Sequence, residues 1–462
     1  MGLPGIRSLA RDLGVGRITV ITAYDELAAE GYLVRRIGSG TLVAGRPPEV
    51  VPHALPLGPG PGSARATGPA RREQRGPAFD LRPGRPELAN FPVELWSRLT
   101  REAWRDLSRC GRVLAEIAAD PGGDPLLREA LATYAGASRG ARAGPERIVV
   151  GTSPRSLVGA LAHLLPGRAG TAVVEDPGDP SLRAVLAALG TRLVPVPVDD
   201  HGLQVHRLPD RADLVLVGPA WQRPRGGSLA PQRRAALLAW AAARDALIIE
   251  DDTGREIRFQ GLHPTALQVA AEDRVVYVGD LGPGIHPGLS FGFAILPARV
   301  AAGLIRLLGL TADRPPAANQ RALARFVAEG HLDRHLRRLR VVQAERQLAL
   351  LEALRLQLGG FLSVAPAPTG DAIVATILDG RWSASAVAGA CLQRGVAVAP
   401  VADFRLAPGP DRELVLSFTG HSPEGLAEAV SRMARAVAAG PERADGARAG
   451  RPGRRAFVGA AS

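Results

Sequence analysis

The stretch YVGDLGPGIHPGLSFGF, residues 277–293, has the pattern of a buried strand, a turn-rich loop and a second apolar strand. Such loops often carry a reactive side chain, but this one contains Pro and Gly and no nucleophile. A second apolar run ends in Glu250-Asp251-Asp252, where Asp251 either binds a ligand or only caps the strand and pairs with Arg255 or Arg258. No lysine occurs, and all 57 basic residues are Arg, so no side-chain amine is present for nucleophilic chemistry.

Histidines and cysteines offer weaker signals. His331 and His335 are one helical turn apart, as in a helical metal pair, but no HExxH sequence and no third ligand accompany them. We therefore expect a solvated or interface helix face and no metal. Cys110 and Cys391 make no disulfide framework.

Residues 3–44 form the most strongly patterned segment. Helical spacing at 7–13 and 17–30 flanks a tight Gly-Val-Gly turn, and a short basic hairpin follows. The expected buried faces consist of Leu9, Ala10 and Leu13 in the first helix and of Val20, Tyr24 and Leu27 in the second. This order predicts a winged helix-turn-helix whose second helix enters the DNA major groove.

The motifs LP-x-x-R-x-LA, LGV-x-R-x-TV, AY-x-x-L-x-x-EGYL and GSGT resemble those of the GntR family of bacterial transcription regulators. The resemblance implies that Arg7, Arg17, Thr19 and Gly38 contact phosphates and base edges of double-stranded operator DNA. The alternative for the two arginines is a solvated helix charge.

Two departures from the family pattern weaken the expected DNA contact. Family members have a helix before LP-x-x-R, whereas this sequence starts at Met1, so either the true start lies upstream or a core helix is missing. Gly16 and Ile18 stand where the family usually has polar residues. We therefore expect weaker or differently specified DNA binding.

The region after residue 79 alternates apolar runs with helix-length segments. Seven runs are apolar on both faces, which predicts a parallel-type sheet covered on both sides: 147–150, 171–174, 192–196, 213–217, 246–250, 274–279 and 291–296. A long Arg-rich helix near 317–357 then precedes shorter runs at 371–378 and 413–418, which indicate a smaller α+β lobe.

This region resembles the aminotransferase-like domain of MocR-type regulators, a GntR subfamily. The matching segments, in order, are FDLRPGRPELANFPVELW, DPGGDPLLREAL, VEDPGDP, IIEDDTGREIRF, the loop at 277–293 and EGHLDRHLRRLR. The resemblance implies an α/β fold of the fold-type-I transferase class, which binds pyridoxal phosphate (PLP), behind a truncated winged helix-turn-helix.

Four segments are expected from these patterns. Residues 1–44 form the DNA-binding domain and 45–78 a linker rich in Pro, Gly and Arg. Residues 79–437 form the aminotransferase-like domain and its small C-terminal lobe, and 438–462 form a disordered tail.

The resemblance assigns roles in a degenerate PLP site. The position of the Schiff-base lysine is Pro283, so no catalytic residue is expected there, and an Arg elsewhere cannot replace an amine because it stays protonated. Asp251 keeps the place of the carboxylate that protonates the pyridine nitrogen, and Thr253 stands at a family tyrosine. GPAWQRPRG keeps Gln222 but has Trp221 in place of a histidine.

Other site roles are also vacant. Asp179 replaces a tyrosine, Ser290 an arginine and Gly282 a serine, while Pro154 removes one backbone donor from the expected phosphate-binding helix start. These changes together indicate relaxed or redirected ligand binding.

The leading hypothesis is a cytoplasmic transcription regulator that binds promoter DNA as a homodimer, with an effector-binding or dimerisation domain that is not an enzyme. A net charge of +12 agrees with an anionic partner, and neither a signal peptide nor a membrane span is apparent. No covalent cofactor is expected, whereas a PLP held without a covalent bond and another small-molecule effector both stay open. The alternatives are a PLP-dependent aminotransferase and a decayed reading frame.

Overall fold

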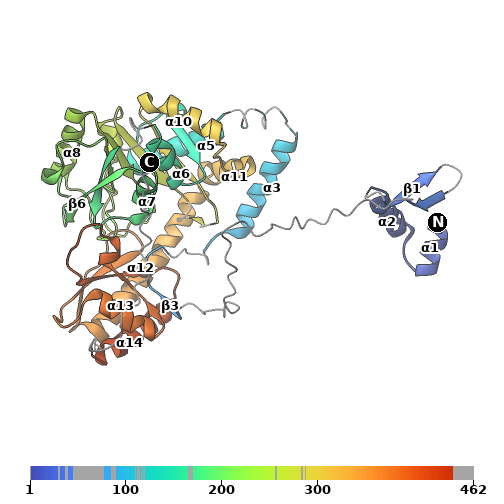
Figure 1. Cartoon of the computed structure of the whole chain (residues 1–462). Helices are drawn as coiled ribbons and strands as arrows, with labels where there is room; N and C mark the ends of the chain where they lie inside the picture. Colours follow the sequence, from blue (N-terminus) through green and yellow to red (C-terminus); the bar gives the residue numbers. More distant parts are fainter. Residues whose placement is uncertain are drawn as a thin grey trace, which may run out of the picture. The chain divides into compact units, whose positions relative to one another are not determined.

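The computed structural model describes residues 2–29, 32–36, 40–44, 77–84, 90–109, 111, 115, 117, 120–164, 170–254, 257–281, 285–286 and 288–440. The chain divides into two compact units, Met1–Gln74 and Arg75–Ser462 (Figure 1). Most of the expected linker, 45–76, and of the expected tail, 441–462, lie outside the described residues.

The first unit contains two helices and a two-stranded antiparallel sheet. Its elements are α1 (Ile6–Leu13), α2 (Arg17–Ala29), β1 (Leu33–Arg36) and β2 (Gly40–Val43). Gly14 ends α1 in the left-handed conformation, at φ 64°, which lets the chain turn at once into α2. The predicted order of helix, turn, helix and hairpin is thus confirmed.

The core of this unit is small. Ala10, Val20, Tyr24 and Leu33 are buried, and the Tyr24 hydroxyl donates a hydrogen bond to the Pro4 carbonyl at 2.9 Å. The prediction that Leu13 and Leu27 are buried was wrong, because they are 62% and 38% exposed. The described part of this unit has only two helices and one hairpin, which do not cover those faces.

The second unit is built on an eight-stranded sheet in the order β4-β11-β10-β9-β8-β5-β6-β7. Strands β6, β5, β8, β9 and β10 are mutually parallel, whereas β11 and β7 pair antiparallel with their neighbours. The bounds are β4 (Ile148–Gly151), β5 (Thr171–Asp176), β6 (Arg192–Asp199), β7 (Gly202–Leu203), β8 (Leu214–Val217), β9 (Leu247–Asp251), β10 (Val275–Asp280) and β11 (Gly292–Ile295). All seven predicted runs are strands of this sheet.

Helices pack on both faces of this sheet. Successive side chains of a strand point to opposite faces, so strands that are apolar throughout present an apolar surface on each face. Tyr277 faces a core with α3, α5 and α11, while Val276 and Val278 face a core with α6, α7 and α10. These helices and α8, which packs on β8 and β9, are α3 (Val93–Arg109), α5 (Pro125–Arg139), α6 (Pro154–Ala162), α7 (Pro180–Ala188), α8 (Pro231–Arg244), α10 (Ala298–Thr311) and α11 (Ala317–Ala328). The predicted three-layer α/β class is confirmed.

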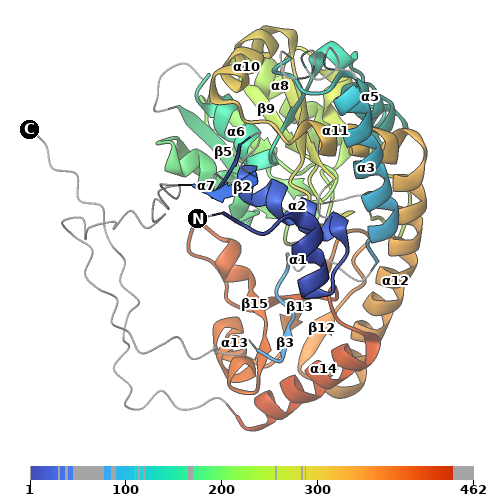
Figure 2. The same cartoon turned by 90° about the vertical axis from the view of Figure 1, so that its right-hand side faces the viewer.

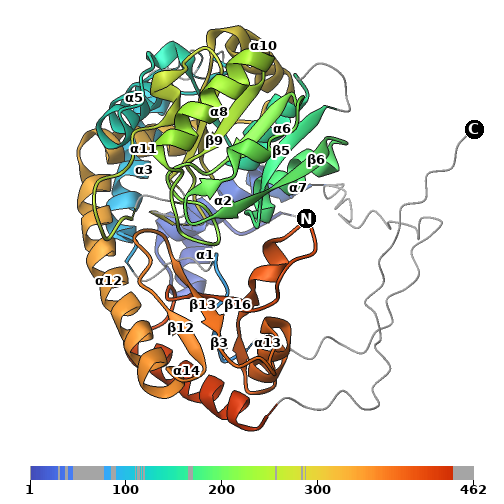
Figure 3. The same ribbon diagram turned by 90° about the vertical axis from the view of Figure 1, so that its left-hand side faces the viewer.

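A smaller lobe follows α12 (His331–Leu358), which runs from the large sheet to this lobe (Figure 2, Figure 3). Its antiparallel sheet has the order β12-β13-β16-β15, and β3 pairs with β14 beside it. The elements are β3 (Phe79–Asp80), β12 (Leu362–Val364), β13 (Ala372–Ile377), α13 (Ala384–Gln393), β14 (Val396–Ala397), β15 (Ala399–Pro400), β16 (Glu413–Ser417) and α14 (Pro423–Ala438). The predicted small α+β lobe is therefore present.

The single long helix predicted near 317–357 is wrong. The structure has two helices, α11 and α12, separated at Glu329 and Gly330. Gly330 adopts φ 71°, a left-handed conformation that a right-handed helix cannot contain. The helical pattern on both sides hides this break in the sequence.

Candidate functional site

The expected DNA-contacting side chains lie at the surface of the first unit. Arg17 is the first residue of α2, Thr19 lies in the same turn, and both are exposed. Arg7 is exposed on α1, and Gly38 lies outside the described residues. The start of α2 thus presents a guanidinium and a hydroxyl to solvent, with the exposed apolar Ile18 between them.

Asp251 is the last residue of β9, at the carboxyl end of the parallel strands. Its Oδ1 accepts hydrogen bonds from the Thr253 amide at 3.0 Å and from the Thr253 hydroxyl at 2.6 Å. Its Oδ2 lies 3.1 Å from Nη2 of Arg223. Arg258, named as an alternative partner, makes no ion pair with Asp251, and Arg255 lies outside the described residues.

Arg223 was missed by sequence reasoning. It occupies an unspecified position of the GPAWQRPRG segment, and its Nη2 lies 2.7 Å from Asp179 Oδ2 and 2.7 Å from the Thr253 hydroxyl. Its guanidinium also lies over the Trp221 ring, 5.1 Å from the ring centroid. The sequence does contain a hint of this pair. A carboxylate, Asp179, stands where the family has tyrosine, and an arginine lies in GPAWQRPRG, another segment of the expected site.

The charges of this cluster stabilise one another. Burial alone lowers the pKa of Arg223, but nearby carboxylates, led by those of Asp179 and Asp251, outweigh burial and raise it. Burial likewise raises the pKa of Asp179, yet Arg223 and the Ser181 amide lower it overall. At neutral pH the guanidinium is therefore a fixed cation.

Gln222, expected to contact a ligand, uses its amide within its own loop. Its Nε2 donates to the carbonyls of Pro177 at 2.7 Å and of Arg223 at 2.8 Å, and its Oε1 accepts from the Arg225 amide at 3.3 Å. The side chain is buried and does not line the cavity beside Asp251. Its visible role is to hold the loop that carries Arg223.

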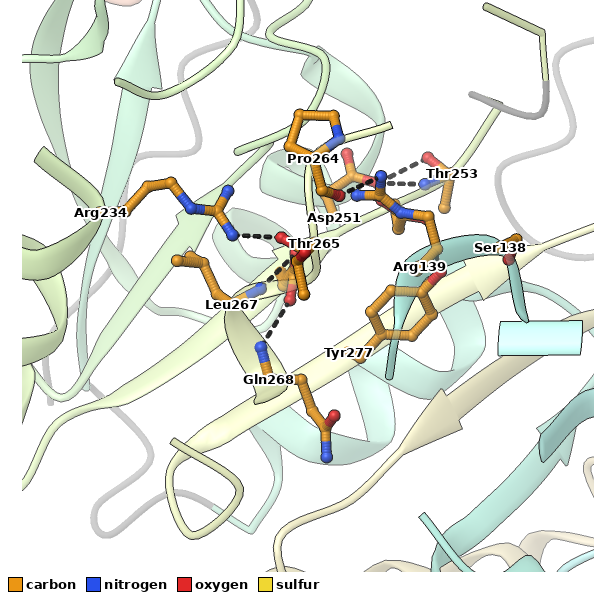
Figure 4. A network of polar contacts seen from close by, with 12 residues as sticks. Ser138, Arg139, Arg234, Asp251, Thr253, Pro264, Thr265, Leu267, Gln268 and Tyr277 are labelled. Carbon is orange, nitrogen blue, oxygen red and sulfur yellow. Dashed lines mark hydrogen bonds and ion pairs between the residues drawn. The ribbon is translucent and has the colours of Figure 1, made fainter. Parts of the chain in front are cut away.

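Asp252 pairs with a different arginine. Arg139, at the end of α5, donates to both Asp252 oxygens, at 2.8 and 3.1 Å, and to the Pro264 carbonyl at 2.6 Å. The Tyr277 hydroxyl donates to the same carboxylate. Figure 4 shows Arg139 between Tyr277 and Pro264. Arg139, Asp252 and Tyr277 line a cavity of about 600 Å³.

At the helix start that is expected to hold a phosphate, two backbone amides already donate hydrogen bonds within the chain. Pro154 begins α6, and Ser153 and Ser156 bind each other's backbone amides in a capping box, at 3.1 and 3.2 Å. The hydroxyl of the preceding Thr152 donates to the carboxylate of Asp313. A phosphate placed here would meet a like charge.

PLP does not fit the residues that are present. The cavity beside Asp251 measures about 20 Å³, room for about one water, whereas ligand pockets start near ~300 Å³. Arg223 already places a cation on Asp251, where a protonated pyridine would lie. Pro283 lies outside the described residues, so the structure adds nothing to the sequence observation that the lysine is absent.

Among the described residues, no group of three or more His, Cys, Asp or Glu side chains is arranged to hold a metal ion. His331 Nε2 lies 3.1 Å from Glu329 Oε2. None of the helices in the described ranges has the length and apolar character needed to cross a membrane.

Comparisons with known proteins agree with both units. Residues 1–43 match the family of bacterial regulatory proteins, gntR family. The chain is 32% identical to the probable rhizopine catabolism regulatory protein MocR of Rhizobium meliloti, over 93% of this chain and 88% of that protein. It is 33% identical to the pyridoxine biosynthesis transcriptional regulator PdxR of Corynebacterium glutamicum, over 95% and 91%.

The fold of the second unit has solved counterparts. The α-aminoadipate aminotransferase LysN of Thermus thermophilus, crystallised with N-(5'-phosphopyridoxyl)-L-leucine, superposes with a TM-score of 0.68 at 24% identity, over 78% of this chain and 92% of that chain. This likeness shows the aminotransferase fold. Together with the full-length relatives, it shows that the chain belongs to the GntR family of transcription regulators and, within it, to the MocR type, which carries an aminotransferase-like domain.

Proposed function

We propose that this chain is a cytoplasmic regulator that binds a promoter operator through the first turn of α2 and performs no transamination. The observation that carries the DNA proposal is the exposure of Arg17 and Thr19 at the start of α2. Residues at the N-terminus of a recognition helix reach base edges, and an Arg can bind guanine with two hydrogen bonds. Arg7 and Gly38 are proposed to contact the phosphate backbone.

The DNA proposal is tested with full-length protein and a promoter fragment. Arg17→Ala is expected to weaken binding by about 1–3 kcal/mol, or roughly 5- to 150-fold in Kd, without changing the melting temperature. Arg11→Ala is the matched control, because Arg11 is also an exposed helix arginine but lies at the end of α1. Equal losses in both variants would mean that Arg17 contributes only net charge.

We infer that the second unit serves dimerisation or effector binding and holds no covalent cofactor. A homodimer would present two α2 helices to two half-sites of an operator. The fold itself favours the alternative, a PLP-dependent aminotransferase. An absorbance spectrum with added PLP, followed by borohydride reduction and peptide mapping, separates the two functions, because a reduced adduct on a side chain would establish the enzyme alternative.

A further inference from the structure

Four carboxylates lie near the guanidinium of Arg223, whereas an ion pair requires only one. Asp179 and Asp251 contact it at 2.7 and 3.1 Å, and Asp280 and Asp371 are close enough to raise its pKa. The Asp371 carboxylate accepts one hydrogen bond from the Gly84 amide at 3.3 Å, and burial raises its pKa. Without a positive charge at the position of Arg223, these carboxylates would lie close together and unpaired, which is unfavourable in a mostly buried site.

Trp221 closes the space beside this cation. Its side chain is buried and lies against Gly370 of the small lobe, where an added Cβ would come within 2.2 Å of the indole ring. Gly370 has φ 91°, so both its backbone and its lack of a side chain suit the contact. Indole and guanidinium together account for the small volume left beside Asp251.

Contacts between the lobes continue on both sides of the cluster. Asp176, at the end of β5, accepts from the amides of Leu406 at 2.8 Å and Ala407 at 3.1 Å. Arg225, two residues after Arg223, lies 2.7 Å from Glu413 of β16. Two hydrogen bonds and an ion pair between the chain's own groups thus join the large sheet to the small lobe near Arg223.

We propose that Arg223 is a built-in substitute for the cofactor's protonated ring: it supplies the cation that Asp251 would otherwise receive from PLP, and it closes the site to PLP. This goes beyond the loss of the Schiff-base lysine, because a lysine-free chain could still bind PLP reversibly. The proposal is also independent of DNA binding by the first unit. Under this proposal the domain folds without a cofactor, and any effector that it binds is a molecule other than PLP.

The first test uses the wild-type full-length protein. Millimolar PLP is expected to leave the melting temperature unchanged and to show no saturable binding in equilibrium dialysis. The measurement is unusually clean, since the chain has no lysine with which PLP could react nonspecifically. A PLP-dependent rise in melting temperature, or saturable binding away from the N-terminal amine, would overturn the proposal.

The second test removes the cation. Arg223→Ala is expected to lower the melting temperature by at least about 4 °C, because Asp179 and Asp251 lose their shared partner. Millimolar ethylguanidinium should restore part of that loss in Arg223→Ala, but should have no such effect on the wild type. Arg225→Ala, which leaves a single carboxylate without its partner, is the control that should show a smaller rescue.

Two outcomes of the second test count against the proposal. If Arg223→Ala is as stable as the wild type, or if ethylguanidinium and sodium ions act alike on it, Arg223 is not the required cation. Should Arg223→Ala fail to fold, Arg223→Gln removes the charge while filling part of the space, and it should still have a lower melting temperature than the wild type. Recovery of PLP binding in either variant would support the exclusion role directly.

Discussion

Asp251 and Asp252 follow each other at the end of β9, and each pairs with an arginine from a distant segment. Asp252 and Arg139 are almost fully enclosed, with 5% and 4% of their side chains exposed, and they line a cavity of about 600 Å³. Arg223, 24% exposed, is instead inserted into the space beside Asp251 and leaves about 20 Å³. An arginine paired with a carboxylate can therefore line a large cavity or leave almost no space beside its partner.

The largest effect is expected from breaking the enclosed pair. Asp252→Asn takes from the buried Arg139 guanidinium the carboxylate with which it is paired, which should cost about 3–5 kcal/mol of unfolding free energy. Urea denaturation measures the loss. Asp273→Asn is the control, since the Asp273 pair with Arg274 is largely exposed on the Asp273 side and should contribute no more than about 1 kcal/mol.

A pH effect should come from the wall of the same cavity. Burial lowers the pKa of His263 from 6.5 to about 4, helped by Arg139 and Arg258. Because the folded pKa is the lower one, the unfolded chain binds the proton first, and stability is lost as pH falls from about 6.5 towards 4. His263 should account for about 2 kcal/mol of the stability lost between pH 7 and pH 5.

Unfolding free energies measured at both pH values check this effect. His263→Gln should show a correspondingly smaller difference between them. His163→Gln, which changes an exposed histidine, should keep the wild-type difference. If both variants behave like the wild type, His263 is not shielded from solvent as its position in the cavity wall indicates.

The smallest effect is expected at Asp251. In Asp251→Asn, Arg223 keeps Asp179 at 2.7 Å, and the new amide oxygen still accepts from Thr253, so the loss should be about 1 kcal/mol. The same urea titrations provide the comparison. A loss larger than that of Asp252→Asn would reverse the order of the two sites and contradict the distinction between them.

Much of the fold could be predicted because its signals are local. Seven apolar runs predict the strands, since a parallel sheet covered on both faces must be apolar on both faces. The break at Gly330 was missed, because a left-handed glycine between two helical patterns leaves no change in periodicity. The exposure of Leu13 and Leu27 was also missed, because helical spacing alone does not show how many neighbours cover a face.

The candidate site was less predictable, because its charges meet across long separations. Asp251 was identified by position, but its partner Arg223 is 28 residues away, and Arg139 lies 113 residues from Asp252. No local pattern specifies such pairs. In the sequence Asp179 appears only as a replacement for the family's tyrosine, and its ion pair with Arg223 follows from the folded structure alone.

The Asp179–Arg223 pair also determines how this site could be altered in the laboratory. Replacing Asp179 with tyrosine would take one carboxylate from Arg223, and replacing Arg223 alone would leave Asp179 and Asp251 facing each other without a cation. The effects of contacting residues are strongly non-additive, so both positions have to be changed together to open the space beside Asp251 without the cost of either single change.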